Sequence, residues 1–181
     1  MEKTIKAELI LENGIKFYGN AFGYIKETVG EVVFTTGMTG YQETLTDPSF
    51  AGQIEDMESR KPFLKGFVVR EKCDVPNNWR CEMNLDDFLQ QNKIMGIEGI
   101  DTRALTRVLR ENGTMKGIIT TRVDDLTPSQ IKQKFDTYTN AYAVKEVTID
   151  EPYTINGIGT HFAVLDCGIK QNILRDLSKK G

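Results

Sequence analysis

The stretch IKAELILENGIKFY, residues 5–18, decides how the fold begins. Two runs of alternating apolar and polar residues, 5–11 and 15–18, flank a turn that contains Asn13 and Gly14. Asn-Gly between such runs is the strongest short-range signal for a β-hairpin, because both residues tolerate a positive φ. The stretch therefore predicts two antiparallel strands joined by a tight turn.

Further strands are predicted from short apolar or alternating runs. Residues 22–25 and 29–34 form a second hairpin-like pattern, and single strands are expected at 66–70 and 117–121. The first part of the chain is therefore predicted to be mainly β-structure.

Three helices are predicted from capping residues followed by apolar residues at helical spacing. They are expected at 85–93, 102–110 and 128–138, capped by Asn84, Asp101 and Thr127. The second is expected to stop at Asn112-Gly113, since glycine commonly ends helices. The third combines an N-cap, a proline at the first helical position and a capping-box glutamine.

The C-terminal residues predict a single βα unit. Residues 161–166 are an apolar run typical of a buried strand, and 169–180 have apolar residues at helical spacing. A lone strand has no neighbour to satisfy its backbone, so this unit is expected to start an α/β domain that the chain does not complete. We therefore expect a first domain over 1–146, a linker over 147–160 and an incomplete second domain over 161–181.

Composition limits the classes of function. The chain has 181 residues, of which 39% are hydrophobic and 27% charged, with a net charge of −3. No apolar run approaches the roughly 20 residues of a membrane span, and no apolar signal core follows Met1, so a cytoplasmic protein is expected. Acidic and basic residues are mixed along the chain, which argues against a nucleic-acid partner. No P-loop or dinucleotide-binding glycine motif is present.

The cysteines and the single histidine offer few sites for chemistry. Cys73, Cys81 and Cys167 are too widely spaced for a paired metal motif, so no metal site is expected. Cys167 follows a predicted strand, where a thiolate could be activated, but it lacks the glycine pattern of a nucleophile elbow and is read as a structural residue. His161 with Ser49 and an aspartate could form a hydrolase triad only if the fold brought them together.

Other charged residues have simple structural readings. Asp101 stands where a helix cap is needed, and Asp166 ends a predicted strand. Arg103, Arg107 and Arg110 repeat at i, i+4 and i+7, so they either form a solvated helix face or contact an acidic partner.

The loop TGMTGYQETLTDPSF, residues 36–50, is rich in hydroxyl groups and glycine. Asp47-Pro48 forces a turn that presents Ser49. The residue types alone are compatible with a surface that binds a small polar ligand.

The order of residues around this loop carries a family resemblance. GEVVFTTGMTGYQETLTDPSFAGQ (30–53) resembles a signature of the small, glutamine-hydrolysing subunit of carbamoyl-phosphate synthase. GIEGIDTRALTRVLRENGTMKGII (96–119) is similar to a helix-and-strand segment of the same family. HFAVLDCGIKQNILRDLSKKG (161–181) resembles the first βα unit of its amidotransferase domain.

This resemblance implies a fold, an activity and partners. The implied fold is α/β: a layered β/β/α N-terminal domain of the swivelling type, followed by the first unit of a class I glutamine amidotransferase domain. The implied activity is glutamine hydrolysis, with ammonia passed to a large subunit that makes carbamoyl phosphate for pyrimidine and arginine synthesis. ATP and Mg²⁺ are expected on that large subunit, and no cofactor is expected on this chain. By position in the motif, Ser49 is implied to contact L-glutamine.

Two departures from the family pattern qualify this implication. The cysteine motif and the later histidine and glutamate of the catalytic triad have no counterpart in the 181 residues, so this stretch alone is expected to be inactive, with no catalytic residue. After Ile54 the family's usual strand and glycine-containing turn are absent, and the chain runs directly into Glu55. Either these residues are deleted or a stretch is missing from the sequence.

Two rival functions follow from the residues alone. A freestanding module could use the hydroxyl-rich loop to bind a small polar ligand, with the C-terminal βα unit closing its own sheet. A self-contained serine or cysteine hydrolase would need Ser49 or Cys167 to act within this chain.

Overall fold

The computed structural model describes residues 4–34, 61–72 and 83–180. The chain divides into two compact units, which consist of 1–36 with 65–139 and of 37–64 with 140–181. Within its described part, the first unit contains a six-stranded sheet and the helices α2 (Leu85–Gln91), α3 (Thr102–Asn112) and α4 (Pro128–Thr137). The second contains the helices α5 (Ala143–Val147) and α6 (Gln171–Ser178) within its described part.

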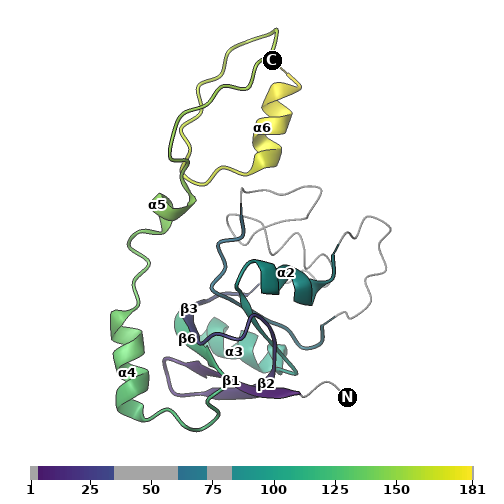
Figure 1. The fold of residues 1–181 in the computed structure, drawn as a ribbon. Coiled ribbons are helices and arrows are strands. Elements are labelled where there is room, and N and C mark those ends of the chain that lie inside the picture. Colours follow the sequence, from purple (N-terminus) through teal and green to yellow (C-terminus); the bar gives the residue numbers. More distant parts are fainter. Residues whose placement is uncertain (1–3, 35–60, 73–82, 181) are drawn as a thin grey trace. The chain divides into compact units, whose positions relative to one another are not determined.

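The predicted N-terminal hairpin is confirmed (Figure 1). Strands β1 (Ile5–Leu11) and β2 (Lys16–Gly23) pair antiparallel, with Leu9 opposite Phe17. Gly14 in the turn has φ +86°, a conformation that glycine adopts without steric cost. The turn chemistry of the sequence therefore sets the register of this pair.

Six strands form one sheet in the order β3-β6-β1-β2-β5-β4. The remaining strands are β3 (Thr28–Val32), β4 (Gly66–Val68), β5 (Met95–Glu98) and β6 (Met115–Thr120). All neighbouring pairs are antiparallel except β4 and β5, which are parallel. The predicted strands at 66–70 and 117–121 are thus confirmed, with shifted ends.

The predicted pairing of residues 22–25 with 29–34 as a second hairpin is wrong, although the strand expected at 29–34 is present as β3 with shifted ends. Phe22 and Gly23 end β2, whereas β3 pairs with β6 far along the chain. Strand β2 already has β1 on one side and β5 on the other, so neither of its edges is open to β3. Strand β5 was not predicted, because its four residues are too few to show a period.

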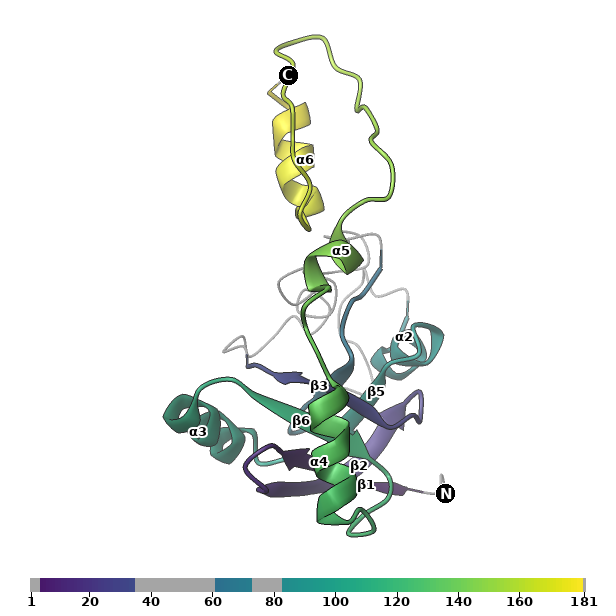
Figure 2. The ribbon, with the colours of Figure 1, turned by 90° about the vertical axis from the view of Figure 1, so that its left-hand side faces the viewer.

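Each face of the sheet has its own core. On one face, Leu9 and Leu11 of β1 pack with Leu105 and Leu109 of α3 (Thr102–Asn112). On the other face, Ile10 packs with residues that include Phe135 of α4 (Pro128–Thr137). Successive strand residues point to opposite faces, so the two helices cover opposite sides of the sheet (Figures 1 and 2).

The predicted helix starts are confirmed by their capping contacts. The side chain of Asn84 accepts from the backbone N–H of Asp87 at the start of α2 (Leu85–Gln91). Asp101 caps α3 in the same way, and Thr127 forms a complete capping box with Gln130. Helix α3 is followed by Gly113 at φ +81°, as its sequence predicts.

The predicted strand at 161–166 is wrong. These residues are extended but pair with no strand in the described part of the chain, and Leu165 is 89% exposed. A strand needs a hydrogen-bonded neighbour, and the 140–180 stretch supplies none. The helix predicted after it is present as α6.

The fold class is therefore α/β with one six-stranded sheet. The β/β/α layering of the swivelling type and the boundaries 1–146, 147–160 and 161–181 stay predictions. Among the helices described, none is long and apolar enough to span a membrane.

A glycine in β2 provides a test of this sheet. A Cβ atom on Gly19 would lie 2.1 Å from the backbone oxygen of Glu98 in the neighbouring strand β5. Gly19→Ala is therefore expected to destabilise the chain by about 1–3 kcal/mol, because the backbone must shift to make room. The urea midpoint, followed by circular dichroism, measures this loss.

Gly30→Ala in β3 is the matched control. Its Cβ atom would lie 3.4 Å from Lys65 Cβ, close to an ordinary van der Waals contact. Its stability is expected to stay within about 0.5 kcal/mol of wild type. Equal midpoints for the two variants would contradict the close approach of β2 and β5.

Candidate functional site

The predicted glutamine contact, Ser49, lies outside the described residues, whereas the strands that precede and follow the undescribed stretch 35–60 are described. Strand β3 leads into the loop and β4 follows it. A Cβ atom on Gly66 would lie 3.2 Å from Thr28 Cγ2, and one on Gly30 would lie 3.4 Å from Lys65 Cβ. The chain therefore leaves the sheet and returns to it at neighbouring points.

This contact joins the two ends of the hydrogen-bonded sheet. Strands β3 and β4 are the first and last in the sheet order, yet they lie so close that a Cβ atom added to Gly66 of β4 would reach 3.2 Å from Thr28 Cγ2 of β3. The sheet therefore curls towards closure, as in a small barrel.

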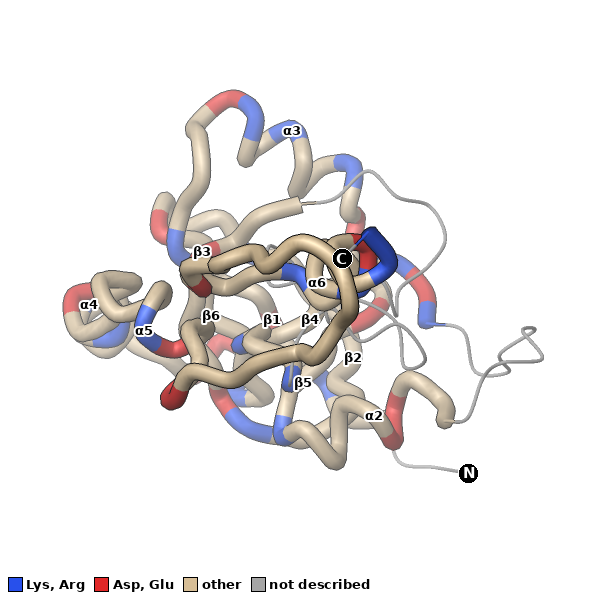
Figure 3. The backbone as a smooth tube through the Cα atoms, turned by 90° about the horizontal axis from the view of Figure 1, so that it is seen from above, with Lys and Arg blue, Asp and Glu red and all other residues tan. Residues whose placement is uncertain are grey.

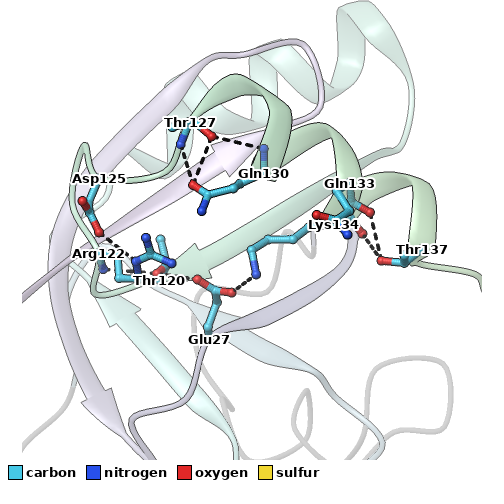
Figure 4. Close-up of polar contacts among 9 residues, drawn as sticks. All are labelled: Glu27, Thr120, Arg122, Asp125, Thr127, Gln130, Gln133, Lys134 and Thr137. Carbon is cyan, nitrogen blue, oxygen red and sulfur yellow. Dashed lines mark hydrogen bonds and ion pairs between the residues drawn. The ribbon is translucent and has the colours of Figure 1, made fainter.

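A polar contact holds the start of β3 (Figure 4). The carboxylate of Glu27, directly before β3, accepts a hydrogen bond from Thr120 Oγ1 of β6 at 2.9 Å and pairs with Lys134 of α4. The backbone N–H of Glu31 donates to the hydroxyl of Tyr138 at 3.3 Å. Strand β3 is thus attached both to its neighbour β6 and to the helix that covers this face.

A second polar cluster lies on the same face of the sheet. Glu8 is fully buried, and its Oε2 lies 3.2 Å from Lys16 Nζ. Its Oε1 accepts a hydrogen bond from the backbone N–H of Asp124 at 3.2 Å. Asp124 Oδ1 in turn accepts from Lys16 Nζ at 2.7 Å and from the hydroxyl of Tyr18 at 3.0 Å. The cluster compensates the buried carboxylate and holds the turn between β6 and α4.

The charges of this cluster stabilise one another. The hydrogen bond from Lys16, followed by that from Tyr18, lowers the pKa of Asp124. The same contacts with Asp124 raise the pKa of Lys16 and of Tyr18. A lysine whose pKa is raised is a weaker nucleophile and base at neutral pH, so these shifts indicate a structural ion pair rather than a catalytic group.

No local sequence pattern predicted this cluster. Its signal was Glu8, the carboxylate in the otherwise apolar centre of the run 5–11. Asp124 is also one of two described residues other than glycine with positive φ, at +54°. That conformation is uncommon for such residues and is fixed here by the hydrogen bond to Glu8.

The second unit contains a cavity of about 430 Å³. Its walls mix apolar side chains with polar ones, which include Tyr153, Asn156 and His161. Cys167 is exposed and is not among the lining residues, so the cavity does not unite the thiol with His161. The lining also includes Ser178, whose hydroxyl donates to the backbone carbonyl of Leu174 at 2.9 Å rather than to His161.

The other candidate residues have structural contacts. Asp166 accepts hydrogen bonds from the backbone N–H groups of Gly168 and Ile169, both at 2.8 Å, and of Ile149 at 2.9 Å. Asp101 caps α3 through the N–H of Ala104 at 3.0 Å. Asp101 thus caps a helix as predicted, whereas Asp166 bonds backbone groups without ending a strand.

The arginine row of α3 is exposed, as predicted. Arg110 lies over the ring of Phe34, with 5.6 Å from Cζ to the centroid. Within the described part of the chain, no group of three or more histidine, cysteine or acidic residues could hold a metal ion.

Comparison with known proteins shows which family the chain is similar to. The family description "Carbamoyl-phosphate synthase small chain, CPSase domain" matches residues 9–55 and 54–119. The chain is 54% identical to the carbamoyl phosphate synthase small chain of Clostridium perfringens, over 98% of this chain and 54% of that protein. It is 40% identical to the pyrimidine-specific small chain of Bacillus subtilis, over 97% of this chain and 52% of the relative. The chain therefore spans about half the length of these curated relatives.

The same comparisons bear on the departure after Ile54. The family match is interrupted where its two segments meet, at residues 54 and 55. The alignment with the Clostridium protein extends over 192 residues, more than the 181 of this chain, so that relative contains residues with no counterpart here.

The polar cluster predicts a pH-dependent effect of Asp124→Asn. Because its pKa is lowered on folding, Asp124 stabilises the fold above its unfolded pKa of about 3.9, and this contribution is lost as the pH falls through the folded value. Asparagine tolerates the positive φ, so only the charge is removed. The variant is expected to be less stable than wild type at neutral pH, with the difference shrinking as the pH falls below the unfolded pKa. Urea midpoints at about pH 7 and pH 3 measure it.

Asp136→Asn is the control, since Asp136 forms only an exposed i, i+4 pair with Lys132. Little change is expected at either pH, because such pairs contribute little to stability. A loss for Asp124→Asn that persists unchanged at acid pH would show that its charge is not the cause.

Proposed function

This chain belongs to the carbamoyl-phosphate synthase small chain family, and on that basis we propose that it is part of the subunit that supplies ammonia from L-glutamine for carbamoyl phosphate synthesis. The single observation that carries the proposal is the 54% identity to a small chain over 98% of these residues. The proposed product serves pyrimidine and arginine synthesis, in the cytoplasm.

The proposed role of this stretch is to dock on the large subunit of the synthase. The relatives' designation as small chains implies such a companion. ATP and Mg²⁺ are assigned to that large subunit, and this chain is proposed to bind neither them nor nucleic acid nor a membrane. The stable sheet with a helix on each face supports a docking role, because it offers a rigid surface.

Ser49 is proposed to contact the glutamine. Support comes from its position in the family motif. The attacking cysteine and its partners are proposed to lie in the half of the relatives' length that these residues do not span. The 181-residue stretch is therefore proposed to be inactive alone.

A freestanding binding module is the rival function. Its proposed C-terminal unit would have to close its own sheet, whereas residues 161–166 pair with no described strand. This observation favours the family function over the rival.

Docking is tested by mixing the chain with the large subunit on a sizing column. Co-migration is expected, because the family pairs a small with a large chain. A chain that keeps its circular dichroism spectrum but elutes separately would contradict the docking role, and binding of glutamine by that separate chain would favour the rival.

Ser49→Ala tests the glutamine contact in the complete small chain bound to its large subunit. The KM for glutamine is expected to rise about tenfold, since one hydrogen bond is removed, with synthesis from free ammonia unchanged. Ser129→Ala, on α4, is the control and should leave both reactions unchanged. An unaltered KM in the Ser49 variant would exclude this contact.

A further inference from the structure

Helix α3 presents an arginine face to solvent. Leu105 and Leu109 on one side of the helix are buried in the core, and Arg103, Arg107 and Arg110 are exposed. Their i, i+4, i+7 spacing places them along one stripe of the helix surface. Basic positions are visible along α3 in Figure 3.

These arginines differ from several other cations of the chain. Lys16, Lys132, Lys134 and Arg122 each form an ion pair with a carboxylate. Among the residues that the structure describes, no carboxylate pairs with an arginine of α3. The arginines of this face therefore have no ion-pair partner in the described part of the chain, although the exposed Glu111 lies four residues after Arg107.

An aromatic side chain adjoins the charged stripe. Phe34, which follows β3, is 36% exposed and lies under the guanidinium of Arg110. Val33 beside it is 49% exposed. Arginine and aromatic residues are enriched in the centres of protein interfaces. There a planar guanidinium can stack on an aromatic ring and can bind one carboxylate through two parallel hydrogen bonds.

We propose that the face formed by Arg103, Arg107, Arg110 and Phe34 is a docking surface for an acidic patch of the synthase large subunit. The inference rests on the proposed function, which supplies the partner. Charge complementarity supplies the chemistry, because three arginines attract carboxylates and would repel a basic surface. The three arginines of the face belong to one helix, which packs on the sheet through Leu105 and Leu109.

The test measures the affinity of the chain for the large subunit by titration calorimetry. Reversing the charge in R103E/R107E is expected to weaken binding at least about tenfold and to reduce its dependence on salt. R103K/R107K keeps the charge and should bind within a few-fold of wild type. K132E, on α4 at the opposite face of the sheet, makes a charge reversal at a site outside the proposed surface and should bind like wild type.

Each outcome bears on the proposal. Wild-type affinity for R103E/R107E, or an equal loss in K132E, would overturn this surface while leaving the proposed function intact. Absence of binding by wild type would overturn both. Loss of wild-type self-association in R103E/R107E, with unchanged large-subunit binding, would assign the face to a second copy and also overturn the proposal. Melting temperatures establish that each variant is folded. If R103E/R107E does not fold, the single variant R107E is used in its place.

Discussion

The pairing of β1 with a strand on each side is the constraint on which the rest of the first unit depends. Leu9 lies opposite Phe17 of β2 and opposite Ile119 of β6. A shift of one residue in this register would turn every side chain of β1 to the other face. The register therefore decides which residues meet α3 and which meet α4.

The same register creates the polar cluster. Glu8 lies opposite Tyr18 and Ile10 lies opposite Lys16, so all four side chains belong to the face covered by α4. Burying the carboxylate of Glu8 without a partner would cost free energy. Lys16, two residues before Tyr18 on β2, provides the opposite charge. Packing and charge on this face thus have one origin, the hairpin.

The second unit differs from the first, because its apolar residues at 162–165 and on α6 are not buried. Its extended residues Phe162, Val164 and Leu165 have the pattern of a core strand, yet they are exposed at 53%, 42% and 89%. The apolar face of α6 likewise contains no buried residue. Such surfaces usually pack against further structure, which agrees with a chain that spans about half the length of its relatives.

The sequence by itself determined the elements whose signals are local: the Asn13-Gly14 turn, the caps of three helices and the family motif around Ser49. Only the tertiary structure decided that β3 pairs with β6, that the four-residue β5 joins the sheet and that Glu8 meets Lys16 and Asp124. These depend on partners up to 116 residues away, which no short-range pattern encodes. The predicted strand at 161–166 failed for the same reason, since an apolar run becomes a strand only where a neighbour accepts its hydrogen bonds.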